Sequence, residues 1–305
     1  MIIQMNKNNI HLENLGPLNL PKVSESPLMY VKPDGELYKD PVRRVLINND
    51  TGDVINVVKK SYSYKNAQYS DGERTVQRIL LDSGINLQGV SRTVQTSHNG
   101  AKAAIVYTLP QYVVDLGRGD ETQFQIAHYN SFDGSWCFTV EVGAVRMLCT
   151  NGQVAIDGFS MYKSKHTPSL SADHAARKVT QALKTFEAEG ERWKRWRENS
   201  ITDVQAFRIF AEAASCKAAL TGLATSVYEL MMMKDVYMNR NLMYMWNQYA
   251  QNEQPLLGST EWAAYNAMTH WSTHAPAGRK TDNILDVKVR RQSLVRVAAT
   301  HKLAA

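Results

Sequence analysis

The chain has 305 residues, of which 44% are hydrophobic and 21% are charged. This composition is that of an ordinary globular protein and argues against wholesale disorder, and the length permits one large domain or two smaller ones. Lys and Arg outnumber Asp and Glu by 35 to 29, which gives a net charge of +6 and a mild bias toward polyanionic partners.

The three cysteines, Cys137, Cys149 and Cys216, are widely spaced and odd in number, which argues against a disulfide framework. No His/Cys cluster has zinc-ligand spacing, so we expect core cysteines and neither a metal nor another cofactor. The N-terminal stretch lacks the pattern of a signal peptide, and no stretch approaches about 18 uninterrupted apolar residues. We therefore expect a protein of the host cell cytoplasm without a membrane segment.

Residues 1–40 carry Asn, Pro, Gly and Lys without a sustained period, which predicts an extended N-terminal arm. The β-rich runs VRRVLINN and GDVINVVKK flank the turn-forming Asn49-Asp50-Thr51-Gly52, and this arrangement predicts a hairpin. The segment ERTVQRILLDSG has helical apolar spacing and ends at Gly84, so it predicts one short helix.

Residues 90–156 predict three or four further strands. Phe138, Val140 and Val142 alternate with polar or small residues, which is the period-two pattern of a strand with unlike faces. Three turns of residues that tolerate positive φ favour consecutive antiparallel strands, at His98-Asn99-Gly100, Asp133-Gly134 and Asn151-Gly152.

After Thr167-Pro168 the pattern becomes helical. We expect a long helix over 172–199, a second from Thr202, a third over 226–250, a fourth from Ser259 and a basic one over 283–302. The third contains three consecutive methionines and predicts a buried central helix. The fold class is then α+β, with an antiparallel sheet region and a short helix in the first half and helices in the second. The expected divisions are an arm at 1–40, a β-rich domain at 41–168 and a helical region at 169–305.

Catalytic motifs are absent: there is no Walker loop, GxSxG elbow, HExxH or GxGxxG opening a helix. We therefore expect no catalytic residue. A metal-dependent enzyme that acts on nucleic acid or nucleotides stays open as an alternative, with Asp133, Glu141, Asp157 or His166 as its ligands. His270 and His274 are four residues apart on one expected helix, but two imidazoles without a third ligand predict surface or core histidines.

Basic residues concentrate in two tracts. Residues 177–197 hold seven basic against three acidic residues, and residues 279–302 hold seven against two. Both tracts suit a phosphate backbone, because neutralising phosphates releases counterions. The hairpin region adds lysines and alternating tyrosines, which suit base stacking or, equally, a solvated edge strand. The candidate contacts are Lys59, Lys60, Tyr62, Tyr64, Lys65, Arg146, Lys163, Lys165, His166, Arg290 and Arg291.

A resemblance to a known family is carried by four segments, HYNSFDGSW, VRMLCTNGQV, SKHTPSL and the later EWAAYNAMTH. Together they resemble the phage- and plasmid-type family known as domain of unknown function 932. Phe132 stands where that family usually has histidine, and Lys165 where it commonly has arginine. The matching positions are Asn130, Ser131, Asp133, Gly134, Ser135, Arg146, Cys149, Thr150, Asn151, Gly152, Lys165, His166, Thr167, Trp262, Asn266, Ala267 and Thr269.

The resemblance implies a setting of mobile DNA elements. The order of hairpin, helix, antiparallel strands and long helix is also similar to the core of phage single-strand annealing recombinases. We expect a non-enzymatic, homo-oligomeric protein that binds single-stranded DNA for annealing or protection in phage replication or recombination. The alternative is a module that binds a host protein through its aromatic and Met-rich helices. Whether Asn130, Asp133, Asn151 and Gly152 serve binding or form turns is left open.

Overall fold

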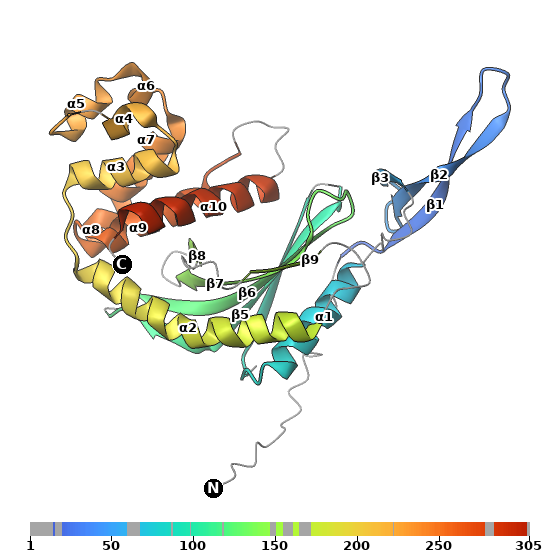
Figure 1. The fold of residues 1–305 in the computed structure, drawn as a ribbon, viewed down its shortest axis with the longest axis horizontal. Helices are drawn as coiled ribbons and strands as arrows, with labels where there is room; N and C mark the ends of the chain where they lie inside the picture. The colour runs from blue at the N-terminus through green and yellow to red at the C-terminus, as the bar shows by residue number, and fades with distance from the viewer. Residues whose placement is uncertain are drawn as a thin grey trace, which may run out of the picture. The chain divides into compact units, whose positions relative to one another are not determined.

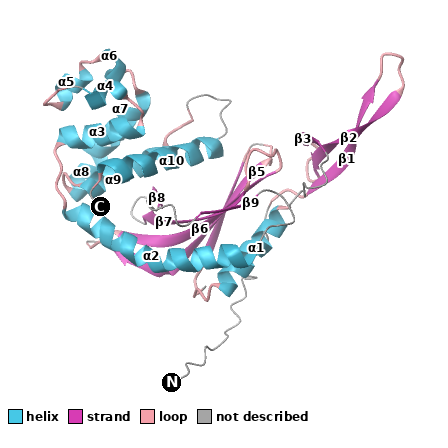
Figure 2. Ribbon diagram, viewed as in Figure 1, coloured by secondary structure: helices cyan, strands magenta, loops and turns pink. Residues whose placement is uncertain are grey.

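The computed structural model describes residue 15 and residues 20–59, 68–86, 88–97, 99–117, 119–146, 151–154, 161–164, 172–221, 223–277 and 284–303. The fold is α+β, with antiparallel sheets and one short helix in the N-terminal half and mostly helices in the C-terminal half (Figures 1 and 2). This confirms the expected fold class.

The chain divides into two compact units. Unit 1 contains residues 1–112, 126–141 and 162–180, and unit 2 contains residues 113–125, 142–161 and 181–305. The division passes through strands of the larger sheet, so each unit takes its strands and helices from separate parts of the sequence.

A three-stranded antiparallel sheet in unit 1 follows the order β1-β2-β3, with β1 at Val23–Val31, β2 at Leu37–Asn48 and β3 at Val54–Lys59. The expected turn joins β2 to β3, where Gly52 has φ +78° and its N–H donates to the Asn48 carbonyl oxygen over 2.8 Å. Residues 23–31 and 37–40, which we expected in an extended arm, belong to β1 and β2.

Helix α1, Tyr69–Asp82, begins at a capping box in which the Gln68 N–H donates to Asp71 Oδ2 over 3.2 Å. It buries Val76, Ile79 and Leu80 and ends before Gly84, whose φ is +69°. The expected short helix is therefore confirmed, although it begins four residues earlier than the charged segment from Glu73.

The larger sheet follows the order β4-β5-β6-β7-β8, and β9 pairs with β7. Its strands are β4 Ser91–Thr96, β5 Lys102–Asp115, β6 Glu121–Ser131, β7 Phe138–Arg146, β8 Asn151–Val154 and β9 Met161–Ser164. Alternate residues of β6 are buried, which is the pattern of a strand with one face in the core. The expected turn at Asn151-Gly152 is wrong, because Asn151 pairs with Arg146 and both Asn151 and Gly152 lie in β8.

The long helix α2, Ala172–Glu198, is confirmed, and Figure 1 shows it running along the strands. Helix α3, Asp203–Ala213, begins where the Thr202 hydroxyl accepts the Gln205 N–H. Helix α9, Glu261–His274, buries eleven of its residues, and α10 spans Ile284–Lys302. These helices confirm the expected ones.

The single buried helix expected over 226–250 is wrong. The Ser226 and Asn239 side chains each accept a backbone N–H from the first turn of a new helix, so the segment breaks into short helices. Met232 is 69% exposed, which contradicts a methionine-lined core helix. Residues 217–257 contain α4 Lys217–Thr221, α5 Val227–Met231, α6 Lys234–Tyr237, α7 Arg240–Gln248, the π-helical turn η2 Tyr249–Glu253 and α8 Gln254–Leu257.

Cys216 is buried as expected, whereas Cys137 is exposed and the expectation of a core residue is wrong for it. Neither of these two thiols forms a disulfide. In the part of the chain that the structure describes, every helix is too short or too polar to cross a lipid bilayer.

Candidate nucleic-acid interface

Aromatic and aliphatic side chains are exposed at the end of the β1–β2 hairpin. Tyr30 and Tyr38 are partners in the strand register, with ring centroids 5.1 Å apart, and are 47% and 37% exposed. Successive residues of a strand point to opposite faces, and the neighbours Met29, Val31 and Leu37 are also exposed. Both faces of this hairpin end are therefore open to solvent.

Cations lie along the same three strands. The Lys32 ammonium lies 5.3 Å from the centroid of the Tyr38 ring and 3.1 Å from Glu36 Oε2. Lys59, one of the expected contacts, is exposed at the end of β3 and is the register partner of Arg43, whose side chain is 64% exposed. Like charges opposite each other on adjacent strands repel, so this pair favours an anion between or above the two side chains.

Most carboxylates in this sheet lie in its connecting turns, whereas Asp40 Oδ2 lies 4.0 Å from Arg43 Nε. Residues 20–59 hold six cations and six carboxylates, but four of the carboxylates, at positions 34, 36, 50 and 53, lie in the two connecting turns. Asp40 accepts the N–H groups of Val42 and Arg43 over 2.8 Å each. Those backbone bonds first, and the nearby arginines after them, lower the pKa of Asp40. The strands themselves present an excess of positive charge.

Several expected contacts lie outside the described residues, namely Lys60, Tyr62, Tyr64, Lys65, Lys165 and His166. Lys163 lies on β9, but the position of its side chain is not described. These residues stay predictions.

Arg146 is enclosed in unit 2 instead of facing solvent. Its side chain is 1% exposed, and Nη2 donates to Asp120 Oδ2 and Nη1 to Glu253 Oε2, each over 3.0 Å. The Trp262 indole N–H also donates to Asp120 Oδ2 over 2.9 Å, and the Arg197 guanidinium lies 3.6 Å from that oxygen. A structural role therefore replaces the expected phosphate contact.

Sequence reasoning missed this buried ionic cluster, which we define as Asp120, Arg146, Arg197, Glu253 and Trp262. Burial raises the pKa of Glu253, and the positive charge of Arg146 opposes that shift. Trp262 and Arg146 are both positions of the family resemblance, which was the available signal. Nothing in the local sequence marks Asp120 or Glu253 as their partners.

The two expected contacts on α10 have different environments. Arg291 is 7% exposed and donates to the carbonyl oxygens of Ala275 and Pro276, over 2.6 and 2.9 Å, just beyond the end of α9. Its guanidinium also lies 5.1 Å from the Trp271 ring centroid. A cation there satisfies carbonyls at a helix C-terminus and is favoured by the helix dipole. Arg290 is exposed.

The motif that begins at Asn130 ends β6 and continues into a tight turn before β7, and Asn130 itself is a buried residue of β6. The Asp133 carboxylate accepts the Ser135 N–H over 2.9 Å and lies 3.5 Å from Lys102 Nζ, and Gly134 has φ +73°. These contacts favour the turn reading of Asp133 over a metal ligand. Among the described residues no group of three His, Cys, Asp or Glu side chains could hold a metal ion, and Asp157 and His166 lie outside them.

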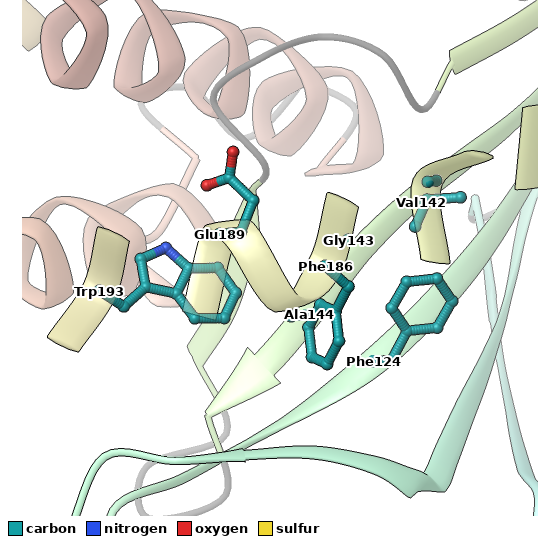
Figure 3. A pocket seen from close by; sticks show the side chains of 8 residues that line it. Phe124, Val142, Gly143, Ala144, Phe186, Glu189 and Trp193 are labelled. Atoms are coloured by element: carbon teal, nitrogen blue, oxygen red, sulfur yellow. The ribbon is translucent and has the colours of Figure 1, made fainter. Parts of the chain in front are cut away.

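A pocket in unit 2 lies between α2 and the strands β6 and β7 (Figure 3). Its walls are mostly apolar, from Phe124, Phe186 and neighbouring residues, with Glu189 and Trp193 at one side. Glu189 forms an ion pair with Arg192 at 2.8 Å. The pocket therefore belongs to the apolar contact between the helix and the sheet.

The family model described as "Domain of unknown function (DUF932)" matches residues 54–295, which is most of the chain. Comparison with curated proteins and with solved structures gives no match. The match includes the buried cluster, the Asn130 turn and helix α9. The chain belongs to the DUF932 family.

Proposed function

We propose that this protein binds single-stranded DNA without catalysing a reaction, and that it holds the strand for annealing or protection in phage replication or recombination. The observation that carries the proposal is the exposed Tyr30–Tyr38 pair on strands that also present Arg43 and Lys59. We name the residues Tyr30, Tyr38, Arg43 and Lys59 the hairpin surface.

The proposed mechanism is stacking combined with charge neutralisation. A base that stacks on an aromatic ring contributes about 1–3 kcal/mol, and stacking tolerates any sequence because every base has a π face. Cations along the strands neutralise phosphates and release counterions, so the affinity falls as salt rises. A duplex keeps its bases stacked inside, which is why the hairpin surface favours single strands.

The test is fluorescence anisotropy with labelled single-stranded and duplex oligonucleotides of about 20 nucleotides across a salt series. Arg43→Gln with Lys59→Gln is expected to reduce the slope of log affinity against log salt by about 1.4, since each lost phosphate contact on a single strand removes about 0.7. Tyr30→Ser with Tyr38→Ser is expected to weaken binding while leaving the salt slope unchanged.

The matched control is Arg74→Gln with Arg78→Gln on α1. This pair removes the same charge from exposed side chains in unit 1, outside the hairpin surface. It is expected to bind like the unmodified protein. If the control loses affinity as much as the Arg43 and Lys59 pair, the net charge alone governs binding and the hairpin surface is not the site.

A protein-binding role is the second candidate, and an exposed apolar group in unit 2 supports it. Leu223, Tyr228, Met232, Tyr237 and Met238 are between 64% and 97% exposed. Such side chains are enriched at protein interfaces. Affinity purification from host cells after nuclease treatment, with Met232→Lys and Tyr237→Lys beside the unmodified protein, tests it. A specific partner that both lysine variants lose supports this candidate, and an unchanged set of proteins removes it.

A further inference from the structure

Three rings form a parallel stack at the end of α9. Tyr244 of α7 and His270 of α9 have ring centroids 5.9 Å apart with planes at 20°, and His270 and His274 have centroids 4.6 Å apart with planes at 16°. The Tyr244 hydroxyl hydrogen-bonds His270 Nδ1 over 3.2 Å, which fixes the first two rings. Tyr244 and His270 are half-buried, whereas His274 is exposed.

Positive charge surrounds this stack. Lys288 of α10 acts electrostatically on His274 and, after burial, lowers the pKa of that imidazole. Burial raises the pKa of Tyr244, and the positive charge of Arg291 opposes that shift. Arg290, the residue before Arg291, is exposed on α10. Burial, followed by the charge of His274, lowers the pKa of His270 to about 4. Both imidazoles are therefore neutral near neutral pH.

This environment discriminates between two ligand classes. A pair of histidines four residues apart on a helix could hold a divalent cation, but Lys288 repels one, and the described residues supply no third ligand of the usual kind. An anion that also has a flat aromatic face satisfies both features, because neutral rings stack and the α10 cations neutralise. A nucleotide has that combination.

We infer that the exposed face of His274 is a stacking site for a base of single-stranded DNA, with Lys288 neutralising the adjacent phosphate. The inference rests on the proposed function for its ligand class, and it places a second contact in unit 2, separate from the hairpin surface of unit 1.

The experiment uses the full chain and a single-stranded oligonucleotide that carries a fluorescent adenine analogue, whose emission is quenched by stacking. His274→Ala is expected to weaken binding by about fivefold or more and to reduce the quenching, which corresponds to the loss of one stacked base. His274→Phe keeps a stacking ring and is expected to retain both. His301→Ala is the matched control, because this α10 histidine is 59% exposed and lies near Glu212.

An abasic oligonucleotide of the same length separates base stacking from phosphate binding. His274→Ala, His274→Phe and the unmodified protein are expected to bind the abasic oligonucleotide with the same affinity. If the unmodified protein binds no oligonucleotide at low salt, the proposed function fails and this inference fails with it. If it binds, but His274→Ala is unchanged or His274→Phe does not restore affinity, the stacking site is overturned while the hairpin proposal stands.

Discussion

Asp120 and Arg146 form a two-pronged ion pair inside unit 2, with Arg146 Nη2 3.0 Å from Asp120 Oδ2 and side chains only 3% and 1% exposed. Glu253 accepts a third bond from the same guanidinium over 3.0 Å. A buried charge is tolerated only while its partners remain, since desolvation is not otherwise compensated. The bond from Arg146 to Glu253 therefore joins β7 to the η2 turn.

Arg146→Ala is expected to destabilise the protein by about 3–5 kcal/mol, because it removes the cation paired with Glu253 and leaves Asp120 with only Arg197, 3.6 Å away. Urea denaturation measures the change, with Arg74→Gln as a surface control. DNA affinity of the folded fraction is expected to be unchanged. A variant that keeps the midpoint of the unmodified protein but loses DNA binding would restore the phosphate-contact role for Arg146.

Gly190 is a tight contact between α2 and β5. A Cβ at this position would lie 2.6 Å from Val114 Cγ2, which is closer than real side chains come. Glycine to alanine in a helix interior normally stabilises by about 1 kcal/mol, but here overpacking is expected to cost about 1–3 kcal/mol. Thermal unfolding of Gly190→Ala, Val114→Ala and the double variant tests this. The double variant should recover part of the loss, and simple additivity would contradict the contact.

The lowered pKa of His270 predicts a loss of stability in acid. The folded value is about 4 against an ordinary value of 6.5. Between these values the unfolded chain binds more protons than the folded one, so stability is fully present above about pH 6.5 and falls as the pH drops toward about 4. Melting temperatures at several pH values measure it. His270→Gln is expected to make the dependence shallower.

Arg290 and Arg291 are adjacent residues with separable roles. Arg291→Gln removes the guanidinium that bonds the Ala275 and Pro276 carbonyls, so it is expected to destabilise by about 1–3 kcal/mol. Arg290→Gln is expected to leave the urea midpoint unchanged, because its side chain is exposed, and to weaken DNA binding instead. The two variants carry the same net charge. Equal effects of both on stability would contradict this division.

Local sequence determined most of the secondary structure. The Asn49–Gly52 turn, the Thr202 cap and the alternation along β7 depend on neighbours within a few residues, so their patterns could be interpreted correctly. In the methionine-rich segment over 226–250, hydrophobicity alone predicts one continuous helix, which is wrong. Its internal caps, Ser226 and Asn239, are equally local signals that predict helix breaks.

The candidate sites required tertiary structure. Arg146 and Arg291 have the same side chain as the exposed Arg290 and Arg43, and no pattern within a few residues tells a buried arginine from a surface one. Arg146 is paired with Asp120 and Glu253, which are 26 and 107 residues away. The sequence by itself determined most of the helices and strands and the family of this protein. Only the tertiary structure decided which cations face water, because burial and ion pairing depend on contacts between residues far apart in the chain.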